Sequence, residues 1–319
     1  MNYRTLGRTG LRCSEIGLGT WALASRVYGD VTSETAAKTI GTALDNGITF
    51  FDSAPLYGDD DHDGIAEERL GLALGTRRDE AVISTKFGRN SREEGKANFH
   101  AKRARSSVEE SLTRMGTDRI EVLFFHSPFS PDDIHDDVWE ELGRLKDEGK
   151  VLHVAHSISL FEDTQQMARD WAAERKIDVI QVVYSLMNRE AESLIHDLAE
   201  QGIGIVARES LANGFLSGRI TKDTVFPEGS LNAQYSREDI AERVDQAERL
   251  RFLVRDDVTS LPQAALRWVL DNPATSLVLS GAIQPDEIEE CAAASDAAPF
   301  HEDEMRTAKE LHQKDFPAA

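Results

Sequence analysis

The sequence predicts an α/β fold, a (β/α)8 or TIM barrel in which eight parallel strands alternate with helices and close into a ring. Three observations predict it. Short apolar runs recur along the chain, most are followed by an amphipathic stretch of helix length, and 319 residues suit one barrel with insertions, since about 250 residues is typical. Runs that are apolar throughout are typical of parallel strands buried on both faces. Eight strand–helix units favour a closed barrel over an open sheet.

The expected strands are short and mainly apolar, and they occupy residues 15–19, 49–53, 81–86, 120–126, 152–157, 177–183, 203–207 and 276–279. Apolar residues recur at helical spacing in several intervening stretches, at 101–115, 139–148, 164–174 and 190–201. No linker rich in Pro, Gly and Ser divides the chain, so we expect residues 1–319 to form a single domain.

Two segments do not fit the repeat. Residues 1–14 contain turn signals at 6–10 and precede the first barrel strand, which predicts a β-hairpin that caps one end of the barrel. Residues 208–240 form a long polar, glycine-containing stretch after the seventh strand, before a helix expected around 242–255. Long loops in compact domains are usually functional, and loops that follow barrel strands lie at the active-site end.

Composition limits the partners and the compartment. Apolar residues make up 40% and charged residues 29%, which predicts a well-packed globular protein. The net charge of −21 argues against nucleic acid, because binding phosphates needs a basic surface. It reflects either adaptation to high salt or simply a well-solvated acidic surface.

Two cysteines, Cys13 and Cys291, cannot build a disulfide framework, and free thiols fit a reducing cytoplasm. No run approaches the roughly 18 apolar residues of a membrane span, and residues 1–7 contain no signal-peptide core. We therefore expect a cytoplasmic protein without a membrane partner, and a monomer by default.

Polar residues stand at the ends of consecutive expected strands. Asp52 ends the second strand, Lys86 the third and His126 the fourth, and Tyr57 follows Asp52 by five residues. Neighbouring strands lie about 4.8 Å apart, so these four side chains can converge over the barrel mouth. Any one of them alone would more often be structural, but four compatible residues at the functional end favour catalysis.

The combination suits the reduction of a carbonyl group. Asp52 is the natural counterion of a buried Lys86 ammonium. We expect that ammonium to lower the pKa of Tyr57 and make it a proton donor, while His126 polarises the carbonyl oxygen. Side chains cannot donate hydride, so a redox cofactor is implied. The remaining histidines have no spacing typical of metal ligands, and we expect no metal.

In these residues the sequence resembles the aldo-keto reductase family. The matching stretches run in the family's order over nearly the whole chain: GLGTW at 17–21, GITFFDSAPLYG at 47–58, STKFG at 84–88, FFHS at 124–127, QVVY at 181–184, LANGFLSG at 211–218, and Gly281 and Ala282 with Glu290. The resemblance implies a barrel that binds NADPH or NADH without a Rossmann domain and acts on a small carbonyl substrate. It also implies Tyr57 as general acid, with Trp21, Tyr57 and His126 lining the substrate pocket.

The resemblance assigns a larger set of positions to the cofactor. These are Gly19, Thr20, Asp52, Ser157, Gln181, Arg208, Leu211, Asn213, Gly214, Leu216, Gly218, Gly281, Ala282, Glu287 and Glu290. Within it, Ser157 and Gln181 match positions that hold the nicotinamide carboxamide. Residues 211–218 match the loop beside the pyrophosphate, and residues 280–291 match the segment that recognises the adenosine end.

Two departures concern the nicotinamide end. The family usually has Asn after the serine of strand five, where this chain has Ile158, so one carboxamide contact is missing. Arg208 stands where many members stack an aromatic ring on the nicotinamide. A planar guanidinium can also stack, although its charge would oppose binding of the oxidised ring.

The segment that matches the adenosine end departs most from the family pattern. It has Ile283, Glu287 and Cys291 at positions where members specific for a 2′-phosphate commonly carry other residues. A carboxylate at Glu287 would repel that phosphate but accept a hydrogen bond from a ribose hydroxyl. Arg219 or Lys222 could still bind the phosphate. We expect relaxed or NADH-leaning specificity, against the family's usual preference for NADPH.

Two other functions compete with the reductase. One is a redox sensor or regulatory subunit that binds nicotinamide nucleotide and turns over slowly. The other is a sugar-phosphate isomerase on the same fold, which would leave Tyr57 and Lys86 without a role. The substrate cannot be read from the loops. The acidic run at 59–63 either disfavours anionic substrates near the mouth or is merely a solvated loop.

Overall fold

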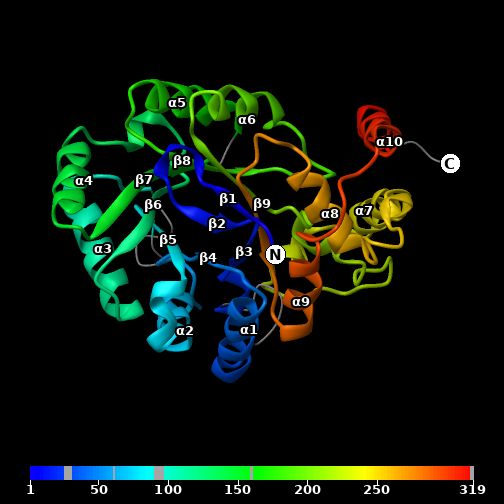
Figure 1. Cartoon of the computed structure of the whole chain (residues 1–319), viewed down its shortest axis with the longest axis horizontal. Coiled ribbons are helices and arrows are strands. Elements are labelled where there is room, and N and C mark those ends of the chain that lie inside the picture. The colour runs from blue at the N-terminus through cyan, green and yellow to red at the C-terminus, as the bar shows by residue number, and fades with distance from the viewer. Residues whose placement is uncertain (25–30, 60–61, 90–96, 159–160, 317–319) are drawn as a thin grey trace.

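In the computed structural model, eight parallel strands form a closed barrel surrounded by helices, as the sequence predicts (Figure 1). The structure describes residues 1–24, 31–59, 62–89, 97–158 and 161–316. Around the ring the strands are β3 (Ile16–Gly19), β4 (Phe50–Asp52), β5 (Val82–Phe87), β6 (Ile120–His126), β7 (Val151–Ser157), β8 (Val179–Val183), β9 (Gly204–Arg208) and β10 (Leu277–Gly281), with β10 pairing back onto β3. Each begins or ends within a few residues of its expected position.

The helices that follow the strands form the outer layer. They are α1 (Ser33–Asp45), α2 (Ile65–Leu74), α3 (Ala101–Met115), α4 (Asp137–Asp147), α5 (Phe161–Ala173), α6 (Glu192–Ala199), α7 (Arg237–Arg249), α8 (Leu261–Leu270), α9 (Pro285–Ala293) and α10 (Glu302–Gln313). Their buried apolar residues pack on the outward faces of the strands in one large core. None of the helices in the described ranges is both long and apolar enough to cross a membrane.

The predicted hairpin closes the amino-terminal end of the barrel. It consists of β1 (Tyr3–Thr5) and β2 (Arg12–Ser14), paired antiparallel. Leu6 and Cys13 join inward-facing residues such as Phe50 and Phe124 in a second, inner core. At the tip only a glycine fits, because Gly7 has φ +50° and a Cβ there would lie 2.2 Å from the Gly204 nitrogen. The opposite, carboxyl-terminal end therefore provides the open mouth.

The stretch after β9 is more ordered than expected, and its helix lies earlier. Two 3-10 turns, at Ala212–Ser217 and Leu231–Gln234, precede α7. The helix expected around 242–255 begins at Arg237, because Ser236 and Asp239 form a capping box there. It ends at Arg249, and Arg255 instead pairs with Val258 in an isolated bridge.

Candidate active site at the carboxyl ends of the strands

A cavity of about 730 Å³ opens at the mouth of the barrel, within the range of pockets that hold a cofactor or substrate. Its floor consists of residues at the last positions of the strands, and its walls come from the loops that follow β3 to β6 on one side and β9 and β10 on the other. The strand register places Asp52 beside Gly19 and Ser84, and His126 in line with Ser157 and Gln181. The four predicted catalytic residues all line this cavity.

Asp52 and Lys86 form a buried ion pair on the cavity floor. The Lys86 Nζ lies 2.7 Å from Asp52 Oδ2 and also donates to the Ser53 carbonyl at 2.7 Å. The second carboxylate oxygen of Asp52 accepts hydrogen bonds from Ser84 Oγ at 2.7 Å and Gln181 Nε2 at 3.1 Å. Burial alone would lower the pKa of Lys86, but Asp52 and Tyr57 outweigh it and the pKa lies above its ordinary value. Lys86 is therefore a fixed cation.

Tyr57 lies directly above this cation. The Lys86 Nζ is 4.7 Å from the centroid of the Tyr57 ring, and Trp21 stacks on the same ring with centroids 6.0 Å apart. Burial raises the pKa of the phenol, and the charge and hydrogen bonding of Lys86 lower it only in part. The net pKa is raised, so the expectation that Lys86 brings it below that of free tyrosine is wrong for this state. Desolvation is the larger effect, and Tyr57 keeps its proton at neutral pH.

His126 ends β6 and faces Tyr57 edge-on, with ring centroids 6.0 Å apart. Burial lowers the pKa of the imidazole well below its usual range, and the charges of Lys86, Arg89 and Arg208 lower it further. The ring is neutral at physiological pH and keeps one N–H donor. Its Nδ1 is buried without a hydrogen-bond partner. Tyr57 and His126 thus offer two neutral donors on neighbouring rings in the cavity.

Ser157 and Gln181 continue the polar floor towards β8. Ser157 Oγ donates to Gln181 Oε1 at 3.2 Å and lies 3.3 Å from Ser127 Oγ. Ser127 follows His126 with a left-handed backbone, φ +50°, which is uncommon for a non-glycine residue and typical of functional turns. Ile158 donates its backbone N–H to the Gln181 carbonyl and supplies no polar side chain, as the sequence implies.

The loop after β9 forms one wall of the cavity. Arg208 donates to the Ile158 carbonyl at 2.9 Å and pairs with Glu209, and its Nε is buried without a partner. Glu209, Ala212, Asn213 and Gly214 all have positive φ. Within these turns the backbone N–H groups of Ala212 and Gly214 donate to the carbonyls of Glu209 and Leu211. The donor set at the floor therefore fits the carboxamide of a nicotinamide dinucleotide, and Leu211, Asn213 and Gly214 line the cavity beside it.

Glu287 has a role that the sequence interpretation missed. One carboxylate oxygen accepts from the backbone nitrogens of Ile283 at 2.7 Å and Gln284 at 3.1 Å and completes the capping box of α9. The other pairs with Arg219, which also lies 3.8 Å from Asp286. Both oxygens of Glu287 thus already accept hydrogen bonds, so Glu287 caps α9 as well as lining the cavity. Glu290 also lines the cavity and is a second candidate acceptor for a ribose hydroxyl.

Four residues assigned to the cofactor do not line the cavity. Thr20 is buried and donates to the Asp52 carbonyl at 3.0 Å. Leu216 and Ala282 pack into the core, and Gly218 ends a 3-10 turn with φ +73°. The remaining assigned positions line the cavity, together with residues that motif matching missed, notably Arg89 and Phe226. Arg89 directly follows the STKFG motif that contains Lys86. This closeness in the sequence is the signal by which Arg89 could have been identified as a cavity residue.

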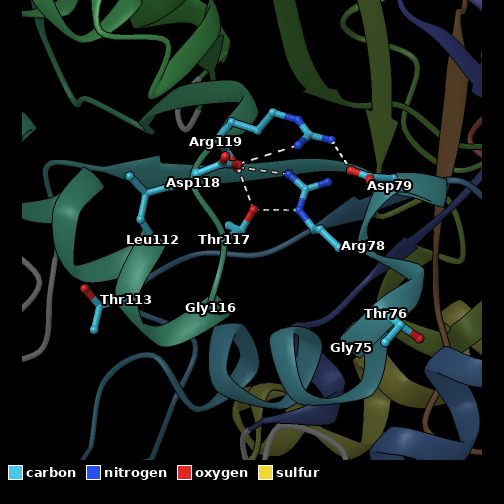
Figure 2. Close-up of a pocket in the computed structure, with 10 residues that line it drawn as sticks. All are labelled: Gly75, Thr76, Arg78, Asp79, Leu112, Thr113, Gly116, Thr117, Asp118 and Arg119. Atoms are coloured by element: carbon cyan, nitrogen blue, oxygen red, sulfur yellow. Dashed lines mark hydrogen bonds and ion pairs between the residues drawn. The ribbon is translucent and has the colours of Figure 1, made fainter.

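A second hollow, of about 720 Å³, lies at the opposite end of the barrel (Figure 2). Figure 2 shows Arg78 and Arg119 within it, bound to neighbouring groups rather than aimed at open space. Arg78 pairs with Glu121 at 2.9 Å, and Arg119 pairs with Asp79 at 2.7 Å. These contacts hold the starts of β5 and β6, so we interpret this hollow as structural.

Comparison with known proteins finds matches over nearly the whole chain. The model of the aldo/keto reductase family matches residues 15–313. The aldo-keto reductase YhdN of Bacillus subtilis is 31% identical over 91% of this chain and 87% of its own length. The NADH-specific methylglyoxal reductase of Escherichia coli is 30% identical over 91% of this chain and 92% of its own. The solved glycerol dehydrogenase AKR11B4 of Gluconobacter oxydans superposes with a TM-score of 0.82 at 25% identity, covering 99% and 97% of the two chains.

Proposed function

The chain belongs to the aldo/keto reductase family and is an NAD(P)-dependent oxidoreductase of carbonyl and alcohol groups, and we propose that Tyr57, Lys86, Asp52 and His126 catalyse its reaction. The observation that carries the proposal is the buried Lys86–Asp52 pair beneath a protonated Tyr57, with a neutral His126 facing the same point. When bound, a reduced nicotinamide supplies the hydride that arrives at the carbonyl carbon.

The catalytic residues act on the carbonyl oxygen. Tyr57 and the neutral His126 donate hydrogen bonds that orient the oxygen and polarise it. As negative charge develops there, Tyr57 transfers its proton to the oxygen, and the product leaves as an alcohol. Because the pKa of the Tyr57 phenol is raised, its phenolate is unfavourable on its own. The positive charge of Lys86 stabilises the phenolate that forms. Asp52 keeps the lysine charged and in place. In the reverse direction the phenolate accepts the proton of the alcohol.

Residues on the cavity floor and on the loops after β9 and β10 would hold the cofactor. Gln181 and Ser157 suit a carboxamide, and Arg208 suits the face of the nicotinamide ring. The loop at 211–214 lines the cavity and would lie beside the pyrophosphate, as the family resemblance implies. Gly19 and Gly281 contribute backbone at the cavity edge, where close approach is possible.

We propose that NADH is used at least as well as NADPH. Arg219 lines the cavity beside the 280–291 segment proposed for the adenosine end, and Glu287 and Asp286 already neutralise its charge. Glu290 adds a further carboxylate to this part of the cavity. A 2′-phosphate would therefore enter an acidic environment, whereas a ribose hydroxyl could donate to Glu290. The relative named as an NADH-specific methylglyoxal reductase supports this preference.

The test is oxidation of both reduced cofactors with a panel of aldehydes, ketones and aldoses. We expect turnover with several carbonyls and a kcat/KM for NADH equal to or above that for NADPH. A preference for NADPH of about a hundredfold would contradict the cofactor proposal. Tight cofactor binding without turnover of any carbonyl would instead favour a regulatory nucleotide-binding protein.

A further inference from the structure

Ser127 lines the cavity but belongs neither to the proposed catalytic group nor to the proposed cofactor residues. It directly follows His126 at the end of β6 and is buried. Its backbone N–H donates to the Phe125 carbonyl at 2.9 Å, and its φ is +50°. Glycine adopts this left-handed region without the strain that a side chain causes. The presence of serine at such a position points to a use for its hydroxyl.

A chain of hydrogen bonds joins Ser127 to the buried ion pair, and the ion pair fixes the direction of the chain. The Asp52 carboxylate, bound to Lys86, can only accept hydrogen bonds, so the Gln181 amide turns its Nε2 towards it, at 3.1 Å. The Oε1 of the same amide then faces the other way and acts as an acceptor. Ser157 Oγ donates its one hydrogen to this oxygen at 3.2 Å.

The direction of this chain decides what Ser127 can offer to a ligand. Because Ser157 has no second hydrogen, Ser127 must be the donor in the 3.3 Å hydrogen bond between the two serine hydroxyls. The hydrogen of Ser127 is thus engaged, whereas its oxygen keeps lone pairs. None of the residues that the structure describes donates a hydrogen bond to that oxygen. Ser127 therefore presents an acceptor to the cavity.

We propose that Ser127 accepts a hydrogen bond from the carboxamide NH2 of the bound nicotinamide and so supplies the polar contact that Ile158 lacks. This inference rests on the proposed function and adds a binding residue to the same site. The strand register aligns His126 with Ser157, and Ser157 with Gln181, so Ser127 lies beside the two residues proposed for the carboxamide. A carboxamide has both a carbonyl oxygen and N–H donors. Gln181 can donate to the oxygen, and Ser127 accepts from the nitrogen.

The test compares NADH with its reduced acetylpyridine analogue, in which a methyl group replaces the carboxamide NH2 and the carbonyl remains. Dissociation constants of both nucleotides are measured for the wild-type protein and Ser127→Ala, without a carbonyl substrate. We expect Ser127→Ala to weaken the binding of NADH by about tenfold, because an amide N–H loses its acceptor. The analogue has no such N–H, so its dissociation constant should change by less than about twofold.

Two further variants separate the hydroxyl from the backbone and from burial. Ser127→Gly removes the same hydroxyl and relieves the left-handed backbone, so it should weaken NADH and spare the analogue in the same way. Ser107→Ala is the matched control, because Ser107 and Ser127 are both 7% exposed and Ser107 lies on α3 in the outer layer. It should change neither dissociation constant. Circular dichroism checks the folding of each variant.

The outcomes separate this inference from the proposed function. Equal weakening of NADH and the analogue in Ser127→Ala, or no weakening of NADH, would overturn the carboxamide contact. An unchanged dissociation constant for NADH with a raised KM for the carbonyl would overturn it in favour of a contact with the substrate. If the wild-type protein binds only NADPH, the same comparison is made with the phosphorylated pair. Failure of the wild-type protein to bind either cofactor would instead remove the proposed function itself.

Discussion

The two ends of the barrel contain hollows of almost equal volume, about 730 Å³ at the mouth and about 720 Å³ at the base, but their polar groups differ in what they bind. At the base, Arg78 and Arg119 pair with acidic side chains and backbone carbonyls around them. At the mouth, the Nδ1 of His126 and the Nε of Arg208 are buried without a partner. Volume alone does not mark an active site, whereas unused hydrogen-bonding capacity beside a buried ion pair does.

The difference also separates stability from catalysis. Arg78 donates to Glu121, to Thr117 at 2.9 Å and to the carbonyls of Ala81 and Arg119 at 2.8 and 2.9 Å. It therefore joins the starts of two strands, and nothing in this network faces the site of reaction. Substitutions at the base or within the barrel strands should therefore change mainly the free energy of unfolding. Substitutions at the mouth should change mainly the reaction with cofactor and substrate.

The largest effect on stability is expected at the base. Arg78→Met leaves the buried Glu121 carboxylate with fewer partners and should lower the free energy of unfolding by about 3 kcal/mol or more. Urea denaturation measures this, with the exposed Arg306→Met as control. The kcat/KM of the folded variant should stay near the wild-type value. A large loss of kcat/KM without loss of stability would contradict the division between the two ends.

A histidine in barrel strand β7, between the two ends, should make the free energy of unfolding depend on pH. His156 is fully buried beside Trp171, and burial lowers its pKa to about 3, from an ordinary value of 6.5. The unfolded chain takes up a proton below pH 6.5 and the folded chain does not, so stability falls as the pH drops from 6.5 towards 3. At pH 5 the loss from this residue is about 2 kcal/mol.

His156→Leu removes that proton uptake, so the variant should lose less stability than the wild type between neutral pH and pH 5. Urea denaturation at both pH values measures the difference. The exposed His196→Leu should behave like the wild type. If His156→Leu lost as much stability as the wild type, the acid sensitivity would have another source.

A smaller effect is expected on the cofactor side of the mouth. Glu287→Gln keeps a side chain that can cap α9 but removes the charge that neutralises Arg219. We expect the ratio of kcat/KM for NADPH to that for NADH to rise by about tenfold, because Arg219 then faces the 2′-phosphate. Glu289→Gln, at an exposed position on the same helix, is the matched control. An unchanged ratio would show that Arg219 does not reach the phosphate.

The strands, and the meeting of Asp52, Tyr57, Lys86 and His126 at the mouth, could be predicted from the sequence because both follow simple rules. Runs such as 120–126 are buried on both faces and are therefore mainly apolar, and polar residues that end them must gather at the mouth. Whether the side chain of a loop residue points into the cavity or into the core could not be predicted. Thr20 and Ala282 sit within matching motifs, yet backbone geometry turns their side chains into the core rather than the cavity.

Two further features needed the structure. Glu287 carries a local signal, since it follows Pro285 at the third position of a helix, but its pairing with Arg219 joins residues 68 apart in sequence. The pKa of Tyr57 depends on a balance between desolvation and the Lys86 charge, and only the packing around the ring shows that desolvation is larger.

The most direct test of the account is the single-turnover rate of hydride transfer in Tyr57→Phe, with bound NADH or NADPH and a carbonyl that the wild-type protein reduces. The phenyl ring keeps the contacts with Trp21 and Lys86 but has no proton to give. We predict a rate lower by about a thousandfold, with cofactor affinity and unfolding free energy close to the wild-type values. A rate within about tenfold of the wild type would contradict the assignment of Tyr57 as the proton donor.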